Sequence, residues 1–163
     1  MEEGASFSWE RRSGCGRAQE PRLYFDDSIR DADWQAVLEL LQQGIRDLQA
    51  VYLFGSFAQG TEYEGSDVDL AVLAGESLPP QTQYALATAC ARRLHREVDL
   101  VDLASANTVL LAQVIGSGRL LFARDPVAVA RFEVTGLAKY CQLNEERREL
   151  LADIRQRGSV YGR

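Results

Sequence analysis

Short apolar runs, each closed by glycine, proline or polar residues, recur through the middle of the chain. Apolar side chains fill 50–54, and a second apolar run follows a pair of aspartates near position 70. Runs of this length between turn-forming residues are typical of strands. The pattern predicts strands at 50–54, 67–73, 98–103 and 119–123.

Longer segments around these runs carry apolar residues at three- and four-residue spacing, which is typical of helices that bury one face. Aspartate before the first segment, proline near the start of the second and glycine after several of them are helix start and stop signals. The predicted helices are 32–43, 80–96, 106–115 and 127–155, with a short helical turn after the strand at 50–54.

Strands that alternate with helices predict an α/β fold. We expect one domain over 31–158 with a small mixed β-sheet of about four strands. Helices are expected to pack on one side of this sheet and to leave the aspartate-bearing face exposed. Residues 1–30 lack sustained periodicity and are expected to form a flexible N-terminal extension, and 159–163 a frayed tail.

The composition limits the classes of partner. The 163-residue chain has a net charge of −6 and a pI near 4.9, whereas a long nucleic-acid footprint requires a basic face. No apolar run approaches the length of a membrane-spanning helix, and the N-terminus has no apolar signal-peptide core. Three cysteines and one histidine lack the spacing of a zinc site or a disulfide framework. We therefore expect a cytoplasmic protein without direct nucleic-acid or membrane partners.

Asp67 and Asp69 open the second predicted strand, and because they are two residues apart both side chains point to one face. Neighbouring carboxylates repel each other, and Mg²⁺ is commonly held by one or two carboxylates together with substrate phosphates. Gly55 and Ser56 follow the preceding strand, where glycine allows close approach of the backbone and turn N–H groups bind anions. A phosphate-binding turn that faces a metal-binding pair predicts phosphoryl or nucleotidyl transfer.

The pair Gly55-Ser56, ten intervening residues and Asp67-Val68-Asp69 together resemble the signature of the DNA polymerase β-like nucleotidyltransferase superfamily. The likeness covers residues 32–155 and points to the minimal nucleotidyltransferases, which pair as antitoxins with HEPN-domain toxins. The resemblance implies the palm fold of that superfamily and a third carboxylate on a neighbouring strand.

Asp99 and Asp102, in the predicted strand at 98–103, are the candidates for that third carboxylate. They are three residues apart and so face opposite sides of a strand, which means that only one can join the site. Similarity to the Val-Asp-Leu-Val-Asp-Leu strands of relatives favours Asp99, with Asp102 as a turn or cap residue. The family usually has arginine where Gln59 stands, so Ser56 and the backbone would carry more of the phosphate contact.

By the same resemblance, Asp67, Asp69 and Asp99 would hold two Mg²⁺ ions, and Gly55 and Ser56 would hold the phosphates of ATP. The implied activity is transfer of AMP to a tyrosine of a HEPN ribonuclease toxin, which neutralises the toxin. Two alternatives stay open: a small-molecule nucleotidyltransferase of the antibiotic-modifying kind, and a non-catalytic antitoxin that binds its toxin by occlusion. The intact aspartates disfavour occlusion, whereas the missing arginine favours it.

Two helical segments allow both a structural and a functional interpretation. Arg92, Arg93, His95 and Arg96 end the second long helix, where cations stabilise a helix C-terminus, but a triphosphate or an acidic partner would also suit them. The apolar stripe of the last helix packs on the sheet, docks an α-helical partner, or does both.

Overall fold

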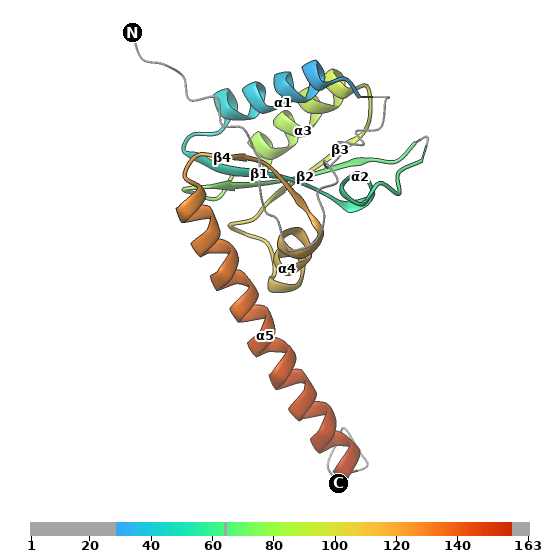
Figure 1. Cartoon of the computed structure of the whole chain (residues 1–163), viewed down its shortest axis with the longest axis vertical. Helices are drawn as coiled ribbons and strands as arrows, with labels where there is room; N and C mark the ends of the chain where they lie inside the picture. The colour runs from blue at the N-terminus through green and yellow to red at the C-terminus, as the bar shows by residue number, and fades with distance from the viewer. Residues whose placement is uncertain (1–28, 64, 158–163) are drawn as a thin grey trace, which may run out of the picture.

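The computed structural model describes residues 29–63 and 65–157 (Figure 1). In chain order the elements are α1 (Asp31–Gly44), β1 (Leu48–Phe54), α2 (Gly55–Gln59), β2 (Val68–Ala74), α3 (Pro80–Leu94), β3 (Val98–Asp102), α4 (Thr108–Ser117), β4 (Arg119–Ala123) and α5 (Pro126–Arg157). Each strand and helix predicted from the sequence is present. The predicted aspartate cap of the first helix is not: α1 begins at Asp31 itself, and its N-cap residue, Arg30, makes no side-chain cap hydrogen bond.

The strands form one mixed sheet in the order β3-β2-β1-β4. β1 is antiparallel to β2 and β4, whereas β2 and β3 are parallel and are joined by the crossover helix α3. In this register Phe54, at the end of β1, lies opposite Asp69 of β2, and Asp69 lies opposite Asp99 of β3. The small mixed sheet of the α/β prediction is confirmed, and it brings the sequence motifs onto adjacent strands.

α1 and α3 cover one face of the sheet (Figure 1). Their apolar stripes pack onto the side chains of β1 and β2 that point to this face, among them Val51, Leu53 and Leu70. Val37 and Leu41 of α1 are fully buried there. Burying a large aliphatic side chain contributes roughly 1.5–3 kcal/mol, so this layer anchors the strands that carry the motifs.

The expectation that helices pack on one side holds only for α1 and α3. On the opposite face, α4 and the first turns of α5 cover Tyr52 and Phe54, with Val114 of α4 and Val129 of α5 in the same apolar cluster. The physical reason is that β1 is apolar at successive positions, so it presents buried side chains to both faces and both need cover. The aspartate-bearing end of this face remains outside that cover.

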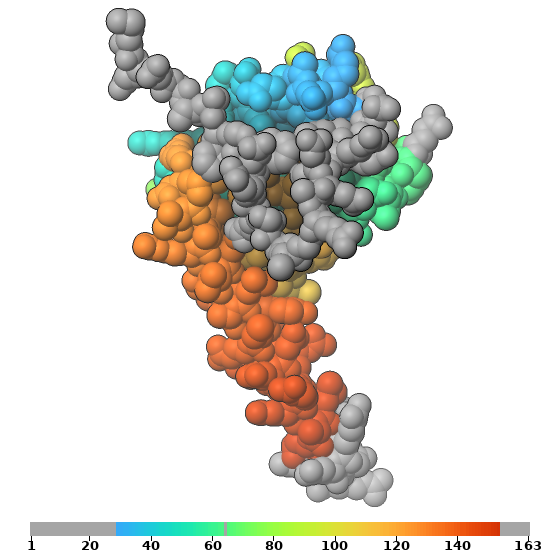
Figure 2. Space-filling view, in the orientation of Figure 1, coloured from blue at the N-terminus to red at the C-terminus, as the bar shows by residue number. Residues whose placement is uncertain are grey.

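α5 is a continuous helix of 32 residues that begins against α4 and then extends away from the sheet (Figures 1 and 2). Gly136 is the point of close approach, because a Cβ there would lie 2.9 Å from a methyl carbon of Leu111 on α4. Farther along, Leu150 and Leu151 are exposed. Among the described side chains, the α5 residues that pack on the domain lie toward the start of the helix, at Val129, Phe132 and Gly136.

Several sequence predictions fall at the ends of the chain. Residues 1–28 of the predicted extension and the predicted tail lie outside the described residues. Ile29, which the sequence pattern left in the extension, is buried in the core beneath α1 and α3. Of the cysteines, Cys90 is buried and Cys141 is exposed, and both are free thiols. Within the described ranges, no helix combines the length and the apolar character that crossing a membrane requires.

Candidate active site

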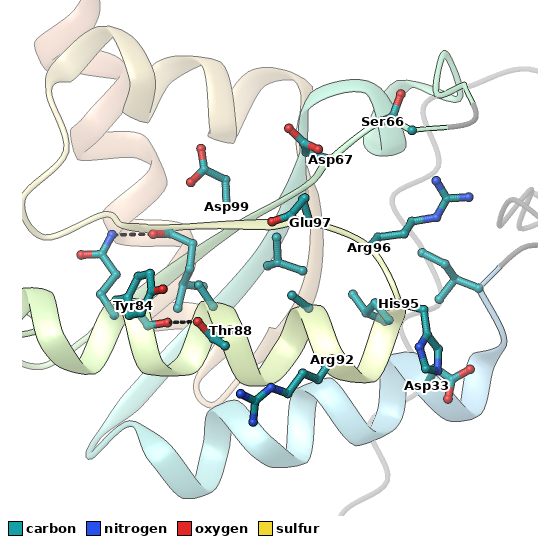
Figure 3. A pocket seen from close by; sticks show the side chains of 18 of the residues that line it. Asp33, Ser66, Asp67, Tyr84, Thr88, Arg92, His95, Arg96, Glu97 and Asp99 are labelled. Atoms are coloured by element: carbon teal, nitrogen blue, oxygen red, sulfur yellow. Dashed lines mark hydrogen bonds between the residues drawn. The ribbon is translucent and has the colours of Figure 1, made fainter.

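Asp67, Asp69 and Asp99 lie on two adjacent parallel strands at one end of the sheet. Asp67 immediately precedes β2, Asp69 is its second residue, and Asp99 is the direct partner of Asp69 on β3. Asp67 and Asp69 share a face because side chains alternate along a strand. Figure 3 shows the Asp67 and Asp99 side chains pointing to the same side, away from α3. The structure thus brings together the three aspartates singled out in the sequence.

The three carboxylates place negative charge close together on this face of the sheet. The pKa of the Asp69 carboxyl is raised, first by burial and then by repulsion from the Asp99 and Asp67 carboxylates. None of the three carboxylates makes a hydrogen bond or an ion pair with the residues that the structure describes. Such a group of acids favours a bound cation, since opposite charge lowers the free energy of the ionised forms.

The three aspartates fit an open Mg²⁺ site, in which the protein supplies only some of the ligands. Across residues 29–63 and 65–157, no three carboxylate, imidazole or thiol groups converge closely enough to form a metal cage by themselves. Unpaired carboxylates repel one another and spread, and Mg²⁺ typically takes only one or two of them while substrate phosphates and water complete its shell. Ligation by Asp67, Asp69 and Asp99 stays a prediction.

Gly55 and Ser56 begin α2 at the point where β1 ends. Gly55 has a positive φ of +67°, and a Cβ at this residue would overlap the carboxylate of Asp69. Only glycine fits both conditions. The backbone at the start of α2 therefore lies directly against the acidic face, as a phosphate-binding turn beside a metal site requires. Phosphate binding by Gly55 and Ser56 stays a prediction.

Asp102, the other candidate for the third carboxylate, has a structural place. Its side chain is 2% exposed and accepts hydrogen bonds from Ser77 Oγ at 2.6 Å, Leu78 N–H at 3.0 Å and Ala104 N–H at 2.9 Å. These bonds tie the end of β3 to the loop before α3. Asp99 lies on the face of the other acids instead, which is the arrangement that alternation on a strand predicts.

The cations at the end of α3 take different positions. His95 is the left-handed C-cap residue of α3, and Arg93 lies 3.8 Å from Asp33 of α1. The Arg96 guanidinium stacks 5.4 Å from the ring centroid of Phe57 in α2. Arg96 therefore brings a positive charge to α2, where Gln59 supplies none. The sequence allows Arg96 a role beyond the helix terminus, but its position beside Phe57 follows only from the fold.

A groove of about 1270 Å³ runs beside the aspartates, between the outer edge of β3 and α3 (Figure 3). We call it the β3–α3 groove. Residues of α3 line one wall, Val98 to Leu100 line the other, and Ser66 and Asp67 lie at one end. No sequence motif predicts this groove, because it depends on β3 being an edge strand and on small side chains of α3.

Comparison with known proteins gives a consistent assignment. The family model for the polymerase β nucleotidyltransferase domain matches residues 35–127, more than half of the chain. This chain belongs to the polymerase β nucleotidyltransferase family. The match spans both predicted motifs, from α1 through α4 to the start of α5, so the family resemblance noted in the sequence is confirmed.

Relatives of this nucleotidyltransferase are similar over most of the chain. It is 40% identical over 118 residues to the protein adenylyltransferase MntA of Shewanella oneidensis, covering 72% of this chain and 84% of that protein. A crystal structure of a toxin–antitoxin with AMP-PNP matches with 39% identity and a TM-score of 0.68, covering 74% of this chain and 96% of that one. A chain in the structure of tri-AMPylated HEPN toxin in complex with MNT antitoxin, from the same organism, matches with 35% identity and a TM-score of 0.64, covering 76% of this chain and 96% of that one.

Proposed function

We propose that this nucleotidyltransferase transfers AMP from ATP to a tyrosine of a HEPN ribonuclease toxin and thereby neutralises it in the cytoplasm. The observation that carries the proposal is the face on which Asp69 pairs with Asp99 beside the start of α2. The named activity of MntA and the AMPylated toxin in the complex of its relatives support the same conclusion. The alternative of a small-molecule acceptor has no comparable support.

The transfer makes one bond and breaks one. The tyrosine oxygen attacks the α-phosphorus of ATP, the bond from that phosphorus to the bridging oxygen breaks, and pyrophosphate leaves with the bonding electrons. Asp99 is exposed and lies next to Asp69, so its carboxylate oxygen takes the proton of the tyrosine hydroxyl. The backbone at Gly55 and the Ser56 hydroxyl hold the β- and γ-phosphates in line.

Mg²⁺ bound by Asp67, Asp69 and Asp99 would supply neutralisation of the phosphate charge and activation of the hydroxyl. The unpaired acids of the site fit this role, because without a cation their mutual repulsion is uncompensated. Two ions bound with the nucleotide would satisfy the three carboxylates. We expect ATP binding to depend on added Mg²⁺ for this reason.

Intact-mass measurement of the toxin after incubation with the protein, ATP and Mg²⁺ tests the proposal. The wild type should add AMP to the toxin in discrete steps. Asp67→Asn should slow this transfer by about a thousandfold or more, because positioning and charge neutralisation supply most of the catalysis. Asp31→Asn, the same change at an exposed acid of α1, is the matched control and should transfer AMP normally.

Two outcomes would contradict the proposal. A stable complex with no gain in mass would mean that the protein neutralises its toxin by occlusion. Equal rates for the wild type and Asp67→Asn would mean that the aspartate face is not the active site.

A further inference from the structure

The outer edge of β3 offers backbone groups for pairing. Glu97 C=O accepts a hydrogen bond from β2 at 2.9 Å, and Leu103 N–H donates one to β2 at 2.9 Å. Backbone groups alternate along a strand, so the odd-numbered residues of β3 face β2, whereas Val98 and Leu100 face outward. The Leu100 carbonyl accepts a hydrogen bond from the Gln83 side chain. The Val98 N–H and C=O and the Leu100 N–H make no hydrogen bond within the described ranges.

The β3–α3 groove gives this edge a floor. Ala87, Thr88 and Ala91 of α3 line it with small side chains. The exposed side chain of Tyr84, one turn before Thr88, lines it too (Figure 3). A groove between a strand edge and a helix accepts an extended segment, which gains main-chain hydrogen bonds from the strand and side-chain contacts from the helix. The lining of the groove runs along α3 from Gln83 to Ala91. At 1.5 Å per helical residue this is about 12 Å, the length of roughly three to four extended residues.

Register connects this edge to the aspartates. A residue of an added strand that lies directly opposite Asp99 points its side chain to the same face as Asp99, whichever way the strand runs. That is also the face of Asp69, the partner of Asp99 across β2. A tyrosine at this position would therefore bring its hydroxyl to the acidic site while the neighbouring residues pair with Val98 and Leu100.

We propose that the acceptor protein adds an extended segment to the outer edge of β3, in the β3–α3 groove, and presents its tyrosine opposite Asp99. This inference rests on the proposed function, since it assigns the docking site of the protein that is modified. The acceptor protein is the expected occupant because the groove is continuous with the candidate active site. The groove begins at Ser66 and Asp67 and its wall includes Asp99, so a segment bound there enters the active site directly. The other sheet edge, β4, is separated from β2 and β3 by β1.

A pair of alanine variants tests the groove. Ala87→Glu places a charge on its floor, whereas Ala85→Glu makes the same change at an exposed position of α3 that does not line it. We expect Ala87→Glu to lower kcat/KM for AMP transfer to the HEPN toxin by about tenfold or more, because burying an unpaired charge under the segment is costly. ATP binding should stay unchanged in both variants, and Ala85→Glu should transfer AMP at the wild-type rate.

Amide hydrogen exchange of the full chain, followed by NMR, gives a readout that does not depend on transfer. The Val98 and Leu100 amides should exchange rapidly in the free protein and become protected when the HEPN toxin is added with AMP-PNP. Normal transfer by Ala87→Glu, or exchange that the toxin leaves unchanged, would overturn the proposal. Protection already present in the free protein would also overturn it, because a segment of this chain would then occupy the edge.

The same experiments separate this inference from the proposed function. If the wild type transfers AMP and the groove variant behaves normally, docking in the groove is wrong and the activity stands. If the toxin protects the β3 amides but gains no AMP, the docking stands and the activity is wrong. Failure of the toxin to bind would overturn both.

Discussion

Gly55 and Gly60 bracket α2 with nearly equal backbone angles, φ of +67° and +66°, but their surroundings differ. A Cβ at Gly55 would overlap the Asp69 carboxylate, whereas one at Gly60 meets nothing within 4 Å. Gly60→Ala should therefore cost about 1 kcal/mol of unfolding free energy, from the left-handed backbone alone. Gly55→Ala carries the same strain and must also displace Asp69, so it should cost more and abolish AMP transfer.

Urea unfolding of the two glycine variants, paired with the AMP-transfer assay, checks this expectation. Gly60→Ala should keep its transfer activity, since the backbone there does not touch the acids. Equal losses of stability and activity in the two variants would show that backbone strain matters at this turn and that the contact with Asp69 does not.

At the scale of single elements, β3 carries two aspartates with opposite consequences. Asp102 is buried and accepts three hydrogen bonds, so Asp102→Ala leaves Ser77, Leu78 and Ala104 donors without their acceptor. We expect a loss of about 3 kcal/mol or more in unfolding free energy. Asp99 is exposed and accepts no hydrogen bond from the part of the chain that the structure describes, so Asp99→Ala should change stability by only about 0.5 kcal/mol.

The activity of the two β3 variants should rank in the reverse order. Asp99→Ala should remain folded but lose AMP transfer, while folded Asp102→Ala, assayed below its unfolding midpoint, should keep much of it. Denaturant unfolding and single-turnover transfer on the same samples measure both quantities. Transfer by Asp99→Ala near the wild-type rate would exclude Asp99 from the site.

At the scale of the whole molecule, local sequence signals predict the helices and strands. They do not predict features that depend on how distant segments pack, such as strand order. The turn residues predict the strand ends, and the two-residue spacing of Asp67 and Asp69 is enough to place both side chains on one face of a strand. The position of β3 at the sheet edge follows from strand order, which no local pattern encodes. The apolar run of β1 is a sequence signal for cover on both faces, because a strand buried on one face only would alternate with polar residues.

The distal part of α5 gives the last prediction. Every residue from Asn144 to Ala152 is exposed, and α5 packs mainly on α4 through its first turns. Side chains that bury no surface add little to stability, so ending the chain after Asn144 should change the free energy of unfolding by no more than about 0.5 kcal/mol. Guanidinium unfolding of the truncated and full-length chains measures this difference.

A control at the other end of the same helix makes the result interpretable. Gly136→Leu should destabilise the domain strongly, because even a Cβ there already lies 2.9 Å from Leu111 and 3.1 Å from Ile115. If the truncated chain were instead as unstable as Gly136→Leu, the residues after Asn144 would have to contribute stabilising contacts, and this prediction would be wrong. The contrast between the two variants thus tests whether the stabilising contacts of the domain end where α5 leaves α4.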